Sequence, residues 1–395
     1  MDHLKAIIIG AGMGGLTTAI ALRQAGYEVH VYDRVRELRP AGAGISLWSN
    51  AIKVLNRLGL GAKVARIGGQ LNGVSYHRHT GEKLNDFSIK PLIEQVGQRP
   101  YPVVRTELQQ MLLDTLGADC VTLDAKCIGV EESADRVTAI FEDGQTATGD
   151  LLIGADGTHS FVREYVLGRS LERVYRDYIN WNGLICLGEE VCPKDYWTLY
   201  VGQHQRAAVM PVGNLPDQPV GESRFYFFFD VPLPADTPTH PDGIRAELTE
   251  FFKDWSTPVQ RIIAQLDPQK TNRVPIHDVN PLERLVRGRV ALVGDAAHST
   301  APDLGQGGAQ AIEDAWAIAN ALLAHNLGVA DALRRYEAQR KDRTEQVVLW
   351  ARKRGDMIHG KDPVKTQRWY DELAQEDGSN IMNAIVKTIQ AGPLG

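Results

Sequence analysis

The chain has 395 residues, 43% of them hydrophobic and 23% charged, which is typical of a globular protein with two domains or one domain with an insertion. Its net charge of −6 argues against a nucleic-acid partner, because there is no cationic excess to neutralise phosphates. No apolar run approaches the ~20 residues needed to cross a bilayer. A strand predicted directly at the N-terminus leaves no room for a signal peptide, and four cysteines without CxxC spacing favour reduced thiols and no metal site. We therefore expect a cytoplasmic protein.

The first predicted unit occupies residues 5–33. An apolar, β-branched run over 5–9 predicts a strand, and a glycine-rich turn at 10–15 follows it directly. Residues 16–26 place apolar side chains at helical spacing before a glycine stop, and 28–32 predict a second buried strand. This order of elements is typical of a dinucleotide-binding βαβ unit.

The glycines of this turn have separate tasks in such a unit. Gly10 allows the tight turn, Gly12 lets a pyrophosphate approach the backbone, and Gly15 lets the helix pack closely on the strand. The helix N-terminus supplies free N–H groups for the phosphates, and Asp33 can accept hydrogen bonds from ribose hydroxyls. The unit alone does not distinguish FAD from NAD.

The next part of the chain alternates helices and strands. A loop of small residues over 39–46 lets the backbone lie close to a ligand, and residues 70–92 predict a β-hairpin. Arg105 precedes a predicted helix whose N-cap is Thr106, and an arginine there can reach a cofactor phosphate. The further predictions are helices over Asn50–Leu58 and Thr106–Leu116 and strands over 121–123, 127–131, 137–141 and 150–153.

Two further glycine-rich turns follow predicted strands. The strand that ends at Ile153 leads into Gly-Ala-Asp-Gly at 154–157, and residues 289–295 form a strand that ends in Gly294-Asp295. The run 296–308 then opens a predicted helix over Ala309–His325, and Asp331–Trp350 predicts a charged helix.

The middle of the chain has a different character. Aromatic and β-branched residues dominate roughly 172–280 and predict an antiparallel sheet laid over the cofactor as a substrate domain. Its predicted strands are 178–187, 196–201, 206–211 and 224–231, and its predicted helices are Ile244–Trp255 and Val259–Leu266.

The three glycine-rich turns together resemble the GxGxxG, DG and GD motifs of the class A flavoprotein monooxygenases, the aromatic hydroxylases. The resemblance covers nearly the whole chain and implies an α/β fold, with a Rossmann-like FAD-binding domain, a mixed or antiparallel substrate sheet and C-terminal helices. The corresponding boundaries are 1–70, 100–171 and 282–330 for the FAD domain, 71–99 and 172–281 for the substrate domain, and 331–395 for the helical segment.

The resemblance also implies the cofactors. FAD is expected to bind tightly but non-covalently, and NADH to reduce it transiently, since there is no second GxGxxG unit. His298, beside Asp295, is expected to have a structural or flavin-neighbouring role. The residues implied in FAD binding are Gly10, Gly12, Gly14, Gly15, Asp33, Arg34, Ser46, Arg105, Cys127, Asp156, Asp295, Gly305, Gln306, Gly307, Gly308 and Ala309.

Within this family the middle segment resembles the urate-hydroxylating members. That likeness implies that Asn180, Arg206 and Tyr226 bind urate and serve catalysis, with Phe227 and Phe228 beside them. It implies that urate, NADH and O₂ give 5-hydroxyisourate, NAD⁺ and water through a flavin C4a-hydroperoxide. An amide and a planar cation suit a flat anion rich in donors and acceptors.

The residues alone leave other interpretations open. Asn180 could satisfy a turn, Arg206 could pair with a surface acid, and some of the phenylalanines on the strand could be core. A hydroxylase of a phenolic or hydroxypyridine substrate, such as salicylate or hydroxynicotinate, is the nearest alternative, and a flavin-binding sensor without turnover is another. The loop at 214–222 looks longer than expected for the relatives. A monomer or homodimer is expected.

Overall fold

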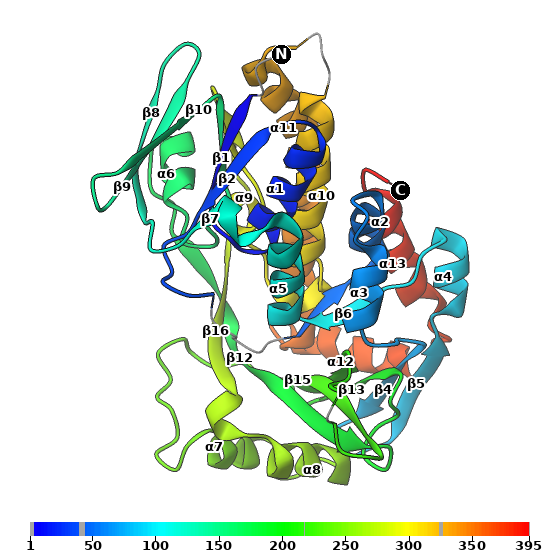
Figure 1. The fold of residues 1–395 in the computed structure, drawn as a ribbon. Coiled ribbons are helices and arrows are strands. Elements are labelled where there is room, and N and C mark those ends of the chain that lie inside the picture. Colours follow the sequence, from blue (N-terminus) through cyan, green and yellow to red (C-terminus); the bar gives the residue numbers. More distant parts are fainter. Residues whose placement is uncertain (1–3, 39–43, 217, 324–326, 395) are drawn as a thin grey trace.

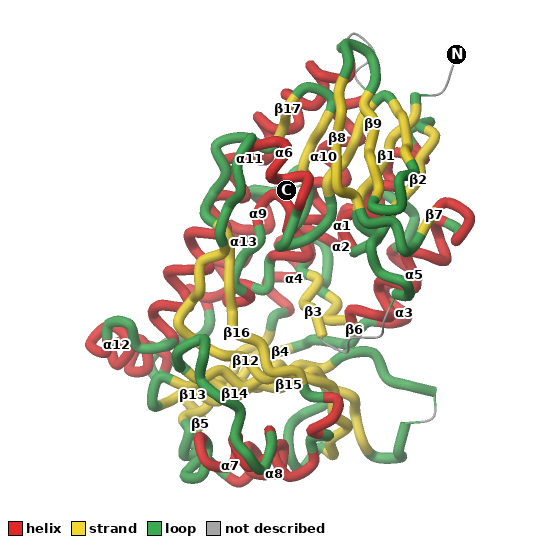
Figure 2. The backbone as a smooth tube through the Cα atoms, turned by 90° about the vertical axis from the view of Figure 1, so that its left-hand side faces the viewer, coloured by secondary structure: helices red, strands yellow, loops and turns green. Residues whose placement is uncertain are grey.

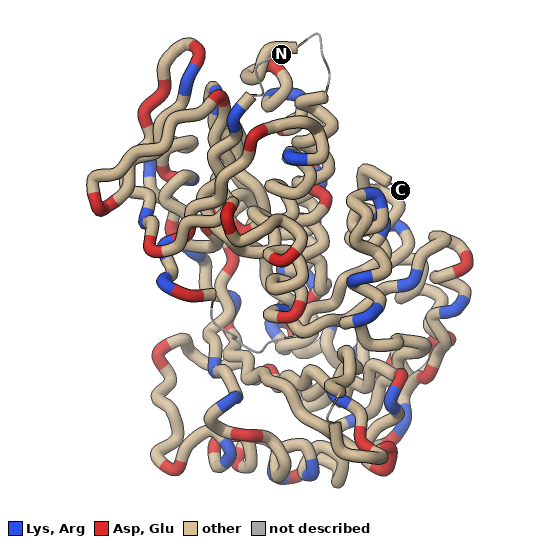
Figure 3. Tube along the Cα trace, viewed as in Figure 1, with Lys and Arg blue, Asp and Glu red and all other residues tan. Residues whose placement is uncertain are grey.

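The computed structural model describes residues 4–38, 44–216, 218–323 and 327–394. Its elements form an α/β fold in which a mainly parallel sheet lies at one end and a larger mixed sheet at the other (Figure 1). The predicted fold class is therefore confirmed, whereas the exact domain boundaries stay a prediction. Figure 3 shows Lys and Arg interspersed with Asp and Glu along the trace.

The mainly parallel sheet is built around the N-terminal strand. Its order is β17-β18-β11-β1-β2-β7, and β17 is antiparallel to β18 while the other pairs are parallel. The central strand β1 packs against α1 (Met13–Gln24) and against β10 (Thr146–Gly149) of a neighbouring antiparallel unit, and it is buried from Ala6 onward, which explains its continuous apolar run. The strands are β1 (Lys5–Ile9), β2 (Glu28–Tyr32), β7 (Val121–Thr122), β11 (Leu151–Gly154), β17 (Val286–Arg287) and β18 (Val290–Leu292).

Two small antiparallel units accompany this sheet. The first is β8 (Cys127–Glu132), β9 (Val137–Phe141) and β10 (Thr146–Gly149), of which β10 was not predicted. The second pairs β3 (Gly44–Leu47) with β6 (Tyr101–Val104). The predicted loop at 39–46 therefore ends in a strand, and its residues 39–43 lie outside the described ones.

The larger sheet has the order β16-β12-β15-β14-β13-β4-β5. All its pairs are antiparallel except β13 with β4, which are parallel, so the sheet is mixed. The predicted hairpin at 70–92 joins this sheet as β4 and β5. The strands are β4 (Gly73–Arg78), β5 (Lys83–Ser88), β12 (Arg173–Gly188), β13 (Tyr196–Gly202), β14 (Gln205–Pro211), β15 (Glu222–Val231) and β16 (Asn272–Val279).

One face of the larger sheet packs on α7 (Ile244–Phe251) and α8 (Thr257–Gln265), which lie beneath it in Figure 2. Alternate residues of β15 point to this face, and Phe225, Phe227 and Phe229 are buried there with Phe252. Side chains alternate between the two faces of a strand, so Tyr226 and Phe228 point to the opposite face. The prediction that Phe227 contacts substrate is wrong for this reason: it is a core residue.

Helices surround both sheets. Their bounds are α1 (Met13–Gln24), α2 (Ser49–Arg57), α3 (Gly61–Ile67), α4 (Lys90–Val96), α5 (Arg105–Leu116), α6 (Phe161–Leu167), α7 (Ile244–Phe251), α8 (Thr257–Gln265), α9 (Asp295–His298), α10 (Gly307–Leu322), α11 (Val329–Ile358), α12 (Pro363–Leu373) and α13 (Ser379–Gln390), with short 3-10 turns η1 (Ala118–Cys120), η2 (Pro268–Lys270) and η3 (Pro302–Leu304). Among the described helices, none is long and apolar enough to span a bilayer.

Several predicted helix ends are corrected by the structure. Helix α5 begins at Arg105 with Val104 as its N-cap, so Thr106 lies inside the first turn and caps nothing. Helix α7 ends at Phe251, before the predicted Trp255, and α11 continues to Ile358 instead of ending at Trp350. The predicted end of α10, His325, lies outside the described residues.

Candidate active site

The three glycine-rich turns meet at one edge of the parallel sheet. They follow β1, β11 and β18, which are parallel neighbours and therefore end at the same edge. The turns also contact one another: the N–H of Ala155 donates to the carbonyl of Ile9 at 2.7 Å, and the N–H of Val293 donates to that of Gly154 at 2.9 Å. The predicted convergence of the three motifs is present in the fold.

The glycines of the first turn are explained by what a side chain would meet. Gly10 has a φ of +113°, and a Cβ there would lie 2.2 Å from the carbonyl oxygen of Ala155. A Cβ on Gly15 would lie 1.9 Å from the carbonyl oxygen of Gly10, so the close packing of helix on strand requires glycine. A Cβ on Gly12 would meet nothing within 4 Å. The backbone is therefore open on this side, and a phosphate could approach it there.

The N-terminus of α1 is free to bind an anion. Its N-cap, Gly12, has no side chain that could accept from the first N–H groups, and the first turn carries no acidic residue. The first N–H groups of the helix and its positive dipole end therefore remain available to a pyrophosphate. The carboxylate of Asp33 accepts hydrogen bonds from the N–H groups of Ala11 (2.6 Å) and Val35 (3.0 Å). It braces the turn, with acceptor capacity left for a ribose hydroxyl.

The carboxylate of Asp156 has a local structural task. It accepts hydrogen bonds from the hydroxyl of Ser160 and from the N–H groups of Phe161 (2.8 Å) and Val162 (3.1 Å), at the start of α6. Burial raises its pKa. Arg163 then joins the second turn to the third, because its guanidinium donates to the carbonyls of Thr158 (2.8 Å) and Ala296 (3.2 Å).

A single cavity of about 300 Å³ joins the three turns to the larger sheet. It brings together most of the residues predicted to bind cofactor and substrate. Those at its wall are Gly12, Gly14, Ser46, Arg105, Asn180, Arg206, Tyr226, Phe228, Asp295, Gly305, Gly307 and Gly308. The predicted residues that do not line it are Gly10, Gly15, Asp33, Arg34, Cys127, Asp156, Gln306, Ala309 and Phe227. Sequence reasoning missed Trp197 and Met210, which line it from β13 and β14.

The polar residues of the substrate side are held by a buried carboxylate that was given no role in the sequence. Asp230 faces Asn180 across β12 and β15, and Arg206 across β14 and β15. Its Oδ1 accepts from Asn180 Nδ2 at 2.6 Å, and its Oδ2 accepts from Arg206 Nε at 2.8 Å. The cross-strand register brings Asn180, Arg206 and Asp230 together, and the sequence did not reveal this register.

A second carboxylate completes the surroundings of Arg206. Asp303, from η3, has its Oδ1 3.2 Å from Arg206 Nη2, and its Oδ2 accepts from the hydroxyl of Tyr178 at 2.8 Å. The side chains of Asp230 and Asp303 are both 0% exposed. Arg206 is thus not paired with a surface acid: it lies between two buried carboxylates, with its guanidinium 5.0 Å from the ring centroid of Phe228.

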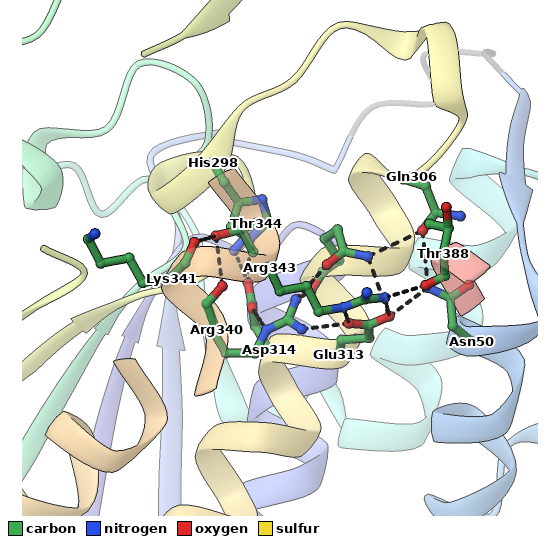
Figure 4. Close-up of polar contacts among 12 residues, drawn as sticks. Asn50, His298, Gln306, Glu313, Asp314, Arg340, Lys341, Arg343, Thr344 and Thr388 are labelled. Carbon is green, nitrogen blue, oxygen red and sulfur yellow. Dashed lines mark hydrogen bonds and ion pairs between the residues drawn. The ribbon is translucent and has the colours of Figure 1, made fainter. Parts of the chain in front are cut away.

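Beneath the third turn lies a buried polar network (Figure 4). Glu313 and Asp314 of α10 pair with Arg340 of α11 at 2.5 and 2.6 Å. His298 Nε2 is 2.6 Å from Asp314 Oδ2, and that carboxylate also accepts from the N–H of Gly294 at 2.8 Å. His298 does not line the cavity, so these contacts agree with a structural role and not with a catalytic one.

The same network reaches the loop that precedes α10. The amide of Asn50 donates to Glu313 Oε1 (2.6 Å) and to Gln306 Oε1 (3.0 Å). Gln306 therefore points into this network, which explains why its side chain is absent from the cavity wall, while the backbone of the adjacent Gly305 and Gly307 lines it. The network supports the N-terminus of α10.

Comparison with known proteins gives a family. The model of the FAD binding domain family matches residues 3–351. FAD-dependent urate hydroxylases from Klebsiella pneumoniae subsp. pneumoniae and Mycolicibacterium vanbaalenii are 50% and 48% identical, each over 99% of this chain and over 100% and 98% of their own lengths.

The structural comparison agrees. Klebsiella pneumoniae HpxO, solved with FAD and uric acid, superposes with a TM-score of 0.95 at 49% identity over 100% of this chain and 98% of its own. A salicylate hydroxylase matches at a TM-score of 0.78 and 22% identity, over 100% of both chains, and shares the fold. The chain belongs to the FAD binding domain family and is, as its three glycine-rich turns predicted, a class A flavoprotein monooxygenase.

Proposed function

We propose that this protein is an FAD-dependent urate hydroxylase. The observation that carries the proposal is the single cavity in which the FAD-type glycine turns meet Asn180, Arg206 and Tyr226. The full-length likeness to FAD-dependent urate hydroxylases supports it. We further propose that NADH and O₂ are the co-substrates and 5-hydroxyisourate the product. A monomeric or homodimeric state and a cytoplasmic location stay predictions.

The residues of the cavity fit FAD. The open face of Gly12 and the uncapped start of α1 suit the pyrophosphate. The Asp295 carboxylate is exposed at the cavity and makes no side-chain hydrogen bond among the described residues, so it can accept from ribityl hydroxyls. Bound FAD supplies the redox chemistry that activates O₂.

The start of α10 can stabilise a reduced flavin. This helix begins at Gly307, and the side chain of its N-cap, Gln306, does not cap the first N–H groups of the helix. The first N–H groups and the positive dipole end of the helix therefore face negative charge that develops beside them. The glycines at this end line the cavity with backbone only, which lets a ring lie close.

The opposite wall of the cavity suits a flat heteroaromatic substrate. Asn180 offers a donor and an acceptor, and Arg206 has Nη1 free of hydrogen bonds and ion pairs within the described residues. Burial, assisted by Asp230, raises the pKa of Tyr226 well above its usual value, so its phenol stays neutral and can donate a proton in a hydrogen bond. Trp197 and Met210 add apolar wall that excludes water.

Urate is expected to accelerate NADH oxidation by the purified, FAD-loaded protein, with oxygen incorporated at C5 of the product. The measurement is NADH absorbance under substrate panels, followed by mass spectrometry of the product formed under ¹⁸O₂. Salicylate and 6-hydroxynicotinate serve as matched probes of the phenolic and hydroxypyridine alternatives. Coupled turnover with either of them and none with urate would refute the substrate assignment. Stimulation by no member of the panel would point to a flavin-binding sensor.

Asp295→Ala is expected to weaken FAD retention, because it removes the carboxylate that we assign to the flavin side of the cavity. The measurement is the FAD-to-protein absorbance ratio after gel filtration, together with the Kd for FAD added back to apoprotein. Asp254→Ala, an exposed aspartate after α7, is the matched control and should keep its FAD. Equal FAD affinity in the two variants would remove Asp295 from the cofactor site.

A further inference from the structure

The charge around Arg206 is already balanced before an anion binds. Asp230 and Asp303 contact its guanidinium, so these three groups carry one net negative charge. Arg354 lies nearby and interacts electrostatically with Arg206 and Asp303, with its guanidinium stacked 4.5 Å from the ring centroid of Trp369. The four groups together are neutral. A urate monoanion beside Arg206 would leave one uncompensated charge in a buried site, which is costly.

A histidine lies where it can supply the missing charge. His359 follows the end of α11, is 8% exposed and stacks on Tyr178 with ring centroids 4.0 Å apart. Its Nδ1 is 3.4 Å from the carbonyl oxygen of His204. A carbonyl only accepts, so Nδ1 carries the proton of the neutral ring, and Nε2 is left with a lone pair.

Within the described residues, no hydrogen-bond donor reaches the lone pair of His359 Nε2. Among the described residues, His359 Nε2 is buried without a hydrogen-bond partner, and it lies 3.9 Å from Asp303 Oδ1. In the neutral ring the lone pair faces a carboxylate oxygen, which stabilises nothing. A proton on Nε2 would turn the same contact into an ion pair. Buried polar atoms without a partner are uncommon, and each one calls for an explanation.

The surroundings of His359 favour a neutral ring in the free protein. Burial lowers its pKa, while Asp230 and Asp303 act to raise it and Arg206 to lower it. The charged and titratable groups that face it are Tyr178 of β12, Arg206 of β14, Asp230 of β15 and Asp303 of η3, together with the carbonyl of His204. An added anion beside Arg206 shifts this balance toward the charged ring.

We propose that His359 takes up a proton from solvent at Nε2 when an anionic substrate binds beside Arg206, and that the imidazolium then pairs with Asp303. No bond other than N–H forms, and no electrons are transferred. His359 is a positioning residue in this scheme: through Asp303 it keeps Arg206 available to the substrate. The inference rests on the proposed function, because it takes the urate monoanion as the ligand.

The expected pH dependence follows from the direction of the two pKa values. The pKa of His359 is low in the free protein and higher in the complex, so binding takes up a proton at pH values between them. In that window the Kd for urate should rise about tenfold per pH unit, with about one proton taken up per urate bound. Below the lower pKa and above the higher one, no uptake is expected.

The test uses the oxidised, FAD-loaded protein without NADH, so that no turnover occurs. Urate binding is measured by titration calorimetry in buffers of different ionisation enthalpy, which gives the number of protons exchanged, and repeated from neutral pH upward. His359→Gln, which keeps hydrogen-bonding capacity but cannot be charged, should bind urate without proton uptake and with a pH-independent Kd. His240→Gln, on the loop before α7, is the matched control and should behave as wild type.

The outcomes separate the two proposals. Urate binding to wild-type protein without proton uptake overturns the role of His359 and leaves the hydroxylase assignment standing. Uptake that persists in His359→Gln places the proton elsewhere and overturns the role as well. If urate neither binds nor is hydroxylated, the proposed function fails, and this inference fails with it. FAD content and melting temperature establish that each variant is folded. If His359→Gln does not fold, His359→Asn is used in its place.

Discussion

Replacing Arg206 with glutamine is expected to lower kcat/KM for urate by ~10- to 150-fold. A hydrogen bond to a charged group contributes about 1.5–3 kcal/mol, and each ~1.4 kcal/mol is a factor of ten in rate. Glutamine keeps some donor capacity but removes the planar fork. Residual NADH oxidation should yield more hydrogen peroxide, because a misplaced substrate leaves activated oxygen unused. Steady-state urate kinetics and a peroxide assay measure both effects.

The buried position of Arg206 adds a second expectation. The variant leaves Asp230 and Asp303 without the cation that lies between them, so its melting temperature should also fall. Arg224→Gln is the matched control: Arg224 lies on neighbouring β15, pairs with Glu107 at 2.6 Å and is absent from the cavity wall. It should keep wild-type urate kinetics. Wild-type kcat/KM and coupling in folded Arg206→Gln would show that the arginine has no part in substrate binding.

Arg340→Leu is expected to destabilise the protein by about 3–5 kcal/mol, because it leaves two buried carboxylates without their shared cation. Arg340 is 1% exposed, and the side chains of Glu313 and Asp314 are 0% exposed. Although burial acts to raise their pKa values, the neighbouring cations hold both below the usual range. Urea unfolding of the FAD-loaded protein measures the loss.

The pH dependence of this effect has a definite sign. Carboxylates with lowered pKa values stabilise the fold above their unfolded pKa, about 4, and that stabilisation is lost as the pH falls through the folded values. The difference between wild type and Arg340→Leu should therefore be largest at neutral pH and shrink in acid. Arg335→Leu, an exposed position on the same helix, is the control and should change stability by less than about 0.5 kcal/mol. Equal unfolding midpoints for wild type and Arg340→Leu would contradict the assigned role of the network.

The parts of the site that the sequence predicted are those encoded locally. Strand, glycine turn and helix follow one another within a few residues, so the turns that begin at Gly10, Gly154 and Gly294 could be recognised, and parallel pairing then placed them together. Resemblance supplied Asn180, Arg206 and Tyr226, which the structure places at one cavity. Strand alternation predicted that some phenylalanines of this strand are core, and, counted from Tyr226, it places Phe227 on the opposite face.

What the sequence did not reveal depends on contacts between distant segments. Asp230 holds Asn180 and Arg206 only because β12, β14 and β15 adopt one particular register. Asp303 and His359 reach the same place from η3 and from the end of α11, far apart in the chain. Helix α13 lies in the segment 331–395, for which the resemblance implied helices, but its bounds were not predicted because it is held by tertiary packing of Val386 and Ile389 against α4.

The strand order of the parallel sheet has a consequence for how the protein is made. Strand β1 is synthesised nearly three hundred residues before β18, Val290–Leu292, which completes its sheet. Likewise, β4 is synthesised well before β13, the parallel neighbour with which it pairs. At elongation rates of about 5–20 residues per second, these delays last roughly tens of seconds. The nascent chain therefore exposes apolar strand edges for most of its synthesis, and we expect its yield in cells to depend on chaperones and on growth temperature.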